Sequence, residues 1–186
     1  MHMRLFLASS LDKTISLLIP RLNKDPKGMR VVFIPNAADP YTDAWWVKGD
    51  KNALQAAGFD VIDADLKTLS AAELAGMLDR AEIIHVCGGS VFHLLTLIMQ
   101  RGFADAITSR VMSGAILYTG TSAGSIISAS DVSLYKYDTE EVKFFIADAK
   151  PLALVDFLIV PHANSVEFAE NNKNIIEHAH EVSIPL

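Results

Sequence analysis

The residues best suited to chemistry are the pentapeptide Gly-Thr-Ser-Ala-Gly at positions 120–124, with Ser122 at its centre. An apolar run at 115–118 precedes it, and residues 125–129, which can begin a helix, follow it. A nucleophile elbow has this order: a strand, a sharp turn with the serine at its tip, and a helix. The flanking glycines leave room for a strained backbone and for close packing of helix and strand. This context favours a nucleophilic serine over the alternative, a purely structural turn.

A serine nucleophile requires a base, and His162 is the favoured candidate among six histidines. It directly follows the apolar run 157–161, which we expect to end a strand. If that strand is parallel to the one before Ser122, both residues lie at the same edge of a sheet. The alternative is a histidine in a surface loop. A carboxylate must orient the base, and four candidates remain open: Asp131, Asp138, Glu167 and Glu170.

Further residues could complete such a site. Gly88 and Gly89 follow an apolar run at 82–87, and no lysine or second glycine set completes a phosphate-binding fingerprint around them. We therefore expect the amides of Gly89 and Ala123 to form an oxyanion hole. His93, in the first turn of the next expected helix, is predicted to line the pocket, with helix packing as the alternative. Core positions are expected for His85 and Cys87, and a solvated face for His178 and His180.

The composition limits the class of protein. A chain of 186 residues, 51% hydrophobic and 20% charged, is expected to form one domain over 1–186. The formal net charge of -6 argues against nucleic-acid binding, and no apolar run approaches the roughly 18 residues of a membrane span. One cysteine cannot form an internal disulfide, there is no zinc-type Cys/His cluster, and we expect no metal or cofactor. Without a recognisable signal peptide, a cytoplasmic location is expected.

Short apolar runs alternate with helical segments as far as Ser122, which predicts an α/β fold with a doubly wound, mainly parallel sheet and helices on both faces. The turns after residues 8, 35, 87 and 119 should open onto one edge of the sheet. Beyond residue 130 we expect short strands or a hairpin at 132–137 and 143–147, a buried strand at 154–160, a partly helical segment at 166–179, and a strand that begins at 181.

Three stretches together resemble the dipeptidase E family of serine peptidases, peptidase family S51. They are Cys-Gly-Gly-Ser-Val-Phe-His-Leu-Leu at 87–95, the pentapeptide at 120–124, and Val-Pro-His at 160–162, in the family's order. The resemblance implies a fold like that of class I glutamine amidotransferases, with serine in place of cysteine. It also implies Ser122 as nucleophile, His162 as base, and an oxyanion hole of Gly89 and Ala123. Asp138 lies at about the family's spacing for the acid.

The chain departs from the family pattern. Cys87 and Ser90 stand where the family has glycine and asparagine, which alters the pocket wall expected to include Ser90 and His93. Region 163–174 lacks the arginine that is expected to bind an acidic side chain in aspartyl dipeptidases. The family also usually continues past this chain's last residue into another strand, which could carry the acid.

The resemblance implies a serine-type peptidase that hydrolyses short peptides through an acyl-enzyme. The oligomeric state stays open, with a homodimer as one alternative. An esterase or amidase is a second expectation, because the elbow does not identify the leaving group. A third is a catalytically silent amidotransferase-like domain that binds a ligand or partner. The missing arginine favours this third expectation, whereas Ser122 and His162 oppose it.

Overall fold

The central feature of the structure, a computed structural model that describes residues 2–186, is a five-stranded parallel sheet. Its strands lie in the order β1-β5-β4-β2-β3, and each neighbouring pair is parallel. Parallel neighbours require crossover connections, which the helices between the strands supply. The predicted doubly wound α/β fold is therefore confirmed. The strands are β1 (Leu5–Ala8), β2 (Arg30–Ile34), β3 (Asp60–Asp63), β4 (Ile83–Val86) and β5 (Leu117–Thr121).

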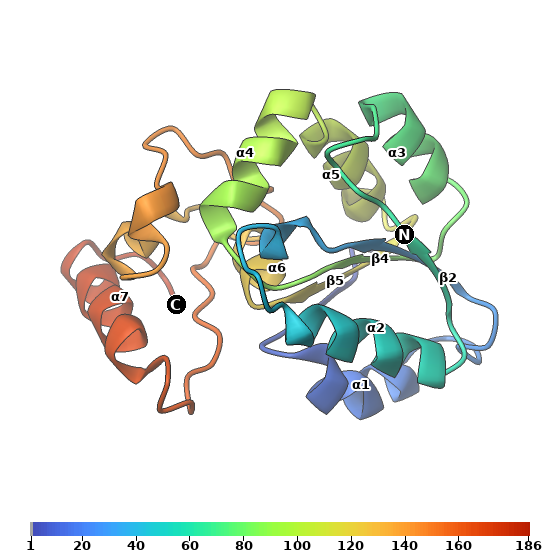
Figure 1. Cartoon of the computed structure of the whole chain (residues 1–186), viewed down its shortest axis with the longest axis horizontal. Helices are drawn as coiled ribbons and strands as arrows, with labels where there is room; N and C mark the ends of the chain where they lie inside the picture. The colour runs from blue at the N-terminus through green and yellow to red at the C-terminus, as the bar shows by residue number, and fades with distance from the viewer. Residues whose placement is uncertain (1) are drawn as a thin grey trace.

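Helices cover both faces of this sheet. They are α1 (Leu11–Leu18), α2 (Trp45–Ala56), α3 (Ala71–Leu78), α4 (Val91–Arg101), α5 (Ala104–Met112), α6 (Ala123–Ile126) and α7 (Ala169–Glu181). Helices α1 and α2 pack together on one face, and α3, α4 and α5 lie on the other (Figure 1). None of the helices among residues 2–186 combines the length and the apolarity that a membrane crossing demands.

The strands divide their apolar side chains between two cores. In β2, Val31 and Phe33 pack with Leu11 and Leu54 of α1 and α2, whereas Val32 and Ile34 belong to the core under α3, α4 and α5. This division follows from the two-residue period of a strand, which turns successive side chains to opposite faces. A strand that is covered on both faces is mostly apolar, as β2 and β4 are.

The last third of the chain contains no strand, which corrects the sequence-based prediction. Segments 132–137 and 143–147 form 3-10 turns instead, η3 (Ser133–Tyr137) and η4 (Val142–Phe144), and segments 154–160 and 182–186 are irregular. Leu152 and Leu154 are buried, but their amides donate to the carbonyls of Ile127 and Ser128 and not to a neighbouring strand. The apolar residues here therefore reflect burial of single side chains and not a strand ladder.

Residues 131–186 and helix α7 lie together beside the sheet, beyond α4 and α6 (Figure 1). Helix α7 packs against η3. The turns that follow β1, β4 and β5 open toward this lobe, because the sheet is parallel and its carboxyl edge is shared. A cleft therefore lies between the carboxyl edge of the sheet and this lobe, and residues from the edge and from the lobe line it.

Candidate active site

Ser122 lies directly after β5, at the start of α6, with φ 47° and ψ −113°. A serine in this conformation is strained, at a cost of about 1–3 kcal/mol. Two glycines permit the turn: a Cβ at Gly120 would lie 2.4 Å from the Gly124 carbonyl oxygen, and one at Gly124 would lie 2.0 Å from that of Val86. The strand, the strained serine and the helix thus have the arrangement of a nucleophile elbow.

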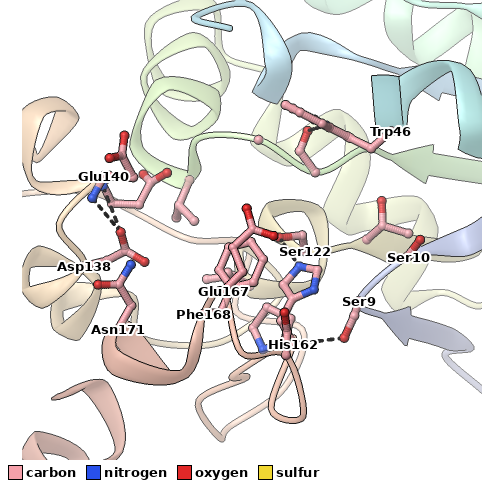
Figure 2. A pocket seen from close by; sticks show the side chains of 18 of the residues that line it. Ser9, Ser10, Trp46, Ser122, Asp138, Glu140, His162, Glu167, Phe168 and Asn171 are labelled. Atoms are coloured by element: carbon pink, nitrogen blue, oxygen red, sulfur yellow. Dashed lines mark hydrogen bonds between the residues drawn. The ribbon is translucent and has the colours of Figure 1, made fainter. Parts of the chain in front are cut away.

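His162 faces this serine. Its Nε2 lies 3.0 Å from Ser122 Oγ, and the two side chains point toward one another in Figure 2. No strand delivers the histidine, contrary to the expectation for 157–161. It is held at φ 60° by two side chains from elsewhere, because its amide donates to Ser9 Oγ (2.9 Å) and Asn172 Nδ2 donates to the Pro161 carbonyl (3.0 Å).

The surroundings of His162 favour its neutral, proton-accepting form. The ring stacks on Phe168 with centroids 4.3 Å apart. Burial lowers the pKa of His162; the charge of Glu167 opposes this, and the charge of Lys13 adds to it. The net result is a pKa below the usual 6.5. Among residues 2–186, no hydrogen-bond partner is in place for its Nδ1 atom.

The structure separates the candidate acids. Glu167 lies in the cavity close enough for its charge to act on His162. Asp138 occupies another part of the cavity wall, near Glu140 and apart from His162 (Figure 2). Its carboxylate accepts hydrogen bonds from the amides two and three residues later, at 2.8 and 3.2 Å. Asp131 accepts one from the Ser133 amide at 2.6 Å. Of the four candidate acids, Glu167 is the one whose charge acts on the pKa of His162.

Two backbone amides beside Ser122 are available to a ligand. Within the described chain, neither the Gly89 nor the Ala123 N–H donates to a protein acceptor. Gly89 has φ 145°, and a Cβ there would lie 2.1 Å from the carbonyl oxygen of Ala37, so only glycine fits. A negatively charged oxygen that forms next to Ser122 could accept from both amides.

A cavity of about 510 Å³ surrounds this serine and histidine. Ser90 and His93, which were predicted to line it, are not among its lining residues. Ser90 is fully buried; it caps α4 by accepting from the His93 amide (3.2 Å), and it donates to Glu141 (3.0 Å). The imidazole of His93 lies 3.5 Å from Asp39. Ser90 is therefore a helix cap, and the position of His93 outside the cavity lining agrees with the alternative, helix packing.

Carboxylates dominate the charge of this cavity. Asp138, Glu140 and Glu141 line one side of it, and Lys13 is the one cationic lysine or arginine among its described lining residues. Burial, followed by the charges of these three carboxylates, raises the pKa of Tyr41 to about 12. Burial also raises the pKa of Glu141 to about 7, although hydrogen bonds from the Phe92 amide and Ser90 oppose it.

Asp50, inside α2, connects the elbow to the rest of the fold. Its carboxylate accepts from the Leu11 amide (2.9 Å) at the start of α1 and from Thr121 Oγ1 (2.7 Å), next to the serine. The second carboxylate oxygen also lies 3.4 Å from Nε2 of His85, a core residue as expected. Burial alone would raise the pKa of Asp50, but the nearby His85, with the hydrogen bonds from Thr121 and Leu11, holds that pKa below its usual value.

We predict that Asp50→Ala lowers the free energy of unfolding by about 3–5 kcal/mol at pH 7, because it leaves buried polar partners unpaired. Since the folded pKa of Asp50 is depressed, its contribution is present above the unfolded pKa of about 4 and is lost as the pH falls through the folded pKa. Urea unfolding of the wild type and of Asp50→Ala should therefore give a smaller difference in free energy of unfolding at pH 3 than at pH 7.

A matched control is Asp63→Ala, which removes an exposed ion pair with Lys51 at the edge of the sheet. Surface pairs contribute about 0–1 kcal/mol, so this variant should unfold almost like the wild type. Equal destabilisation by the two substitutions would contradict the role of Asp50.

Several of these residues were not predicted from the sequence. The sequence does contain a sign that Asp50 is buried. Val47, Asp50 and Leu54 share one helical face, so this carboxylate lies on the apolar side of the helix. Tyr41 and Trp46 are aromatic residues in and after the loop that follows β2, which is a weaker signal. Phe168 carries no local signal, because its contact with His162 arises only in the tertiary structure.

Comparisons with known proteins identify the family of this chain. The sequence pattern of peptidase family S51 matches residues 5–184. An uncharacterised peptidase of Pasteurella multocida is 33% identical over 98% of this chain and 87% of its own length. The peptidase E of Streptomyces coelicolor is 31% identical over 87% of this chain and 59% of its own length.

A solved structure has the same fold. A Listeria monocytogenes protein, provisionally assigned as a peptidase E, superposes with a TM-score of 0.87 at 29% identity, over 95% of this chain and 87% of the other. The family pattern covers all the strands, the elbow and His162. The chain therefore belongs to peptidase family S51, and it is a peptidase.

Proposed function

We propose that this chain hydrolyses short peptides by acyl transfer, with Ser122 as nucleophile and His162 as general base. The observation that carries the proposal is the 3.0 Å contact between His162 Nε2 and the Oγ of a serine held in an elbow. A nucleophile and a base within hydrogen-bond reach are the signature of an activated serine. The family membership supports the class of reaction.

In the first half of the reaction, His162 Nε2 takes the proton of Ser122 while Oγ adds to the peptide carbonyl carbon. The carbonyl oxygen becomes an oxyanion, which accepts hydrogen bonds from the amides of Gly89 and Ala123. The C–N bond then breaks, and the imidazolium of His162 gives its proton to the departing amine. The product is an ester between the acyl group and Ser122.

In the second half, water replaces the amine. His162 takes a proton from the water as its oxygen adds to the ester carbonyl, and the same amides hold the second oxyanion. Collapse breaks the bond to Ser122, whose oxygen recovers the proton from His162, and the carboxylic acid leaves. The protein groups that act in these steps are two side chains and two backbone amides.

We further propose Glu167 as the acid that orients His162. It lines the cavity, and its charge stabilises the imidazolium form of His162, which is what a triad acid must do during proton transfer. A rotation of the Glu167 side chain toward Nδ1 would complete the triad. Asp138 lies at the family's spacing, but its carboxylate accepts hydrogen bonds from two backbone amides of its own loop.

The charge of the cavity suggests which peptides bind. Asp138 and Glu140 attract the α-ammonium group of a free N-terminus and repel an acidic side chain. No arginine lines the described cavity to offset that repulsion. We therefore expect dipeptides with a neutral or basic N-terminal residue to be hydrolysed in preference to Asp-X dipeptides.

The experiment that tests the function is a panel of dipeptides and simple aryl esters, with fluorophosphonate labelling in parallel. Hydrolysis of dipeptides together with labelling of Ser122 is the expected result. Turnover of esters alone would identify an esterase instead. No turnover and no labelling would refute the proposal and leave a binding domain.

The pH profile of kcat/KM provides a further prediction. His162 must be neutral to accept a proton, and its pKa is lowered by burial, so the acid limb of the profile should lie below pH 6.5. Phe168→Ala removes the ring that stacks on the imidazole, so its acid limb should move up toward 6.5. An acid limb that stays in place in Phe168→Ala would count against His162 as the titrating group.

A further inference from the structure

The peptide bond between Gly88 and Gly89 lies directly beside the nucleophile. A Cβ added at Gly88 would come within 2.9 Å of Ser122 Cβ. The peptide presents one polar group to each side, because the C=O of Gly88 and the N–H of Gly89 point in opposite directions across a planar trans unit. Only one of its two orientations turns the Gly89 N–H toward an oxyanion on the substrate. The other orientation would present the oxygen of Gly88, which repels negative charge.

The local backbone does not by itself fix the orientation of the Gly88–Gly89 peptide. Glycine adopts positive and negative φ with similar ease, so a Gly-Gly peptide can rotate at little conformational cost. The flanking residues are anchored: the Cys87 amide donates to the Ile34 carbonyl (3.0 Å), and the Ser90 amide donates to that of Ala37 (2.7 Å). Between these two anchors, the chain needs another contact to choose the direction of the peptide.

Trp46 supplies that contact. Its indole Nε1–H donates to the Gly88 carbonyl oxygen at 2.9 Å, and Figure 2 shows the ring reaching this loop from α2. Within residues 2–186, this is the one hydrogen bond made by either polar group of the Gly88–Gly89 peptide. The ring is itself held edge-on by Tyr41 and Trp45, with centroids 5.5 and 6.0 Å away.

We propose that Trp46 is a positioning residue for the oxyanion hole: it binds the Gly88 oxygen and so keeps the Gly89 N–H directed at the reacting carbonyl. This inference rests on the proposed serine mechanism and adds to it a residue from a different element. The effect belongs to the transition state, because the ground-state carbonyl oxygen carries little charge. Loss of one oxyanion donor lowers kcat by about 10²–10³-fold, which sets the upper limit for loss of Trp46.

The test is Trp46→Phe, which keeps an aromatic ring in the packing and removes the indole N–H. We expect kcat to fall about 10- to 100-fold with KM changed less than threefold. Affinity for a peptide boronic acid, which adds to Ser122 and becomes tetrahedral, should fall in parallel, whereas affinity for the product amino acid should not. A merely structural role would weaken both ligands together. Met112→Ala is the control, because it shortens an exposed side chain at the end of α5 that does not line the described cavity, and it should keep wild-type kcat and both affinities.

A crystal structure of Trp46→Phe separates failure of this inference from failure of the proposed function. The expected result is a Gly88 carbonyl that is turned over or present in two orientations. An unchanged peptide together with wild-type kcat would overturn the inference even if the enzyme is a serine peptidase. If the wild type hydrolyses no peptide, the proposed function fails, and the orientation of this peptide in the variant still decides whether Trp46 positions it.

Discussion

Ser122→Ala is expected to lower kcat for dipeptide hydrolysis by about 10⁵–10⁶-fold, the scale on which removal of a triad serine acts in other serine peptidases. The variant keeps the cavity and both oxyanion amides, so dipeptides should still bind with little change in affinity. It loses the Oγ that attacks the carbonyl and that lies 3.0 Å from His162 Nε2, the atom that takes its proton. Steady-state kinetics and isothermal titration calorimetry measure the two quantities separately.

Ser113→Ala is the control for this experiment, because Ser113 is an exposed serine at the end of α5. It should keep wild-type turnover and full fluorophosphonate labelling, whereas Ser122→Ala should lose the label. Dipeptide hydrolysis that survives in Ser122→Ala at more than a hundredth of the wild-type rate would exclude Ser122 as the nucleophile.

The second large effect is expected for Glu167→Gln, which should lower kcat by roughly 10²–10⁴-fold. Exchange of a triad acid for its amide leaves the geometry but no longer favours the right tautomer or the imidazolium, and costs about 10⁴ in the best-studied case. The acid limb of the pH profile should also move to lower pH, because the charge of Glu167 raises the pKa of His162. A loss of packing that exposed His162 would instead move the acid limb to higher pH, because burial is what lowers the pKa of His162.

Variants of two other carboxylates distinguish Glu167 from the alternative acids. Glu170→Gln, in the exposed first turn of α7, should behave like the wild type. Asp138→Asn should raise KM through the altered charge of the cavity and lower kcat less than tenfold. If Asp138→Asn instead slowed turnover a hundredfold or more, and Glu167→Gln changed it little, the role of the acid would return to Asp138.

Local sequence was sufficient for the sheet and the elbow. The strands up to β5 are short runs between helical segments. β2 and β4 are mostly apolar, because parallel strands covered on both faces need apolar side chains in most positions. The elbow was predictable for a similar reason: Gly120, Ser122 and Gly124 lie within five residues, and the contacts that require the two glycines are made inside the motif or with the adjacent strand. Helix α3 was likewise predictable, since its capping box, Ser70 and Glu73, is complete within four residues.

Only the tertiary structure decided how the site is completed. The apolar run before His162 is not a strand, and hydrogen bonds from Asn172 and to Ser9, residues distant in sequence, hold the histidine in place. Spacing pointed to Asp138, but its carboxylate is occupied by its own loop, and the charge of Glu167 acts on the base. Trp46 reaches Gly88 from 42 residues away. A sequence pattern reports contacts between near neighbours, whereas an active site depends on side chains that meet only after the chain has folded.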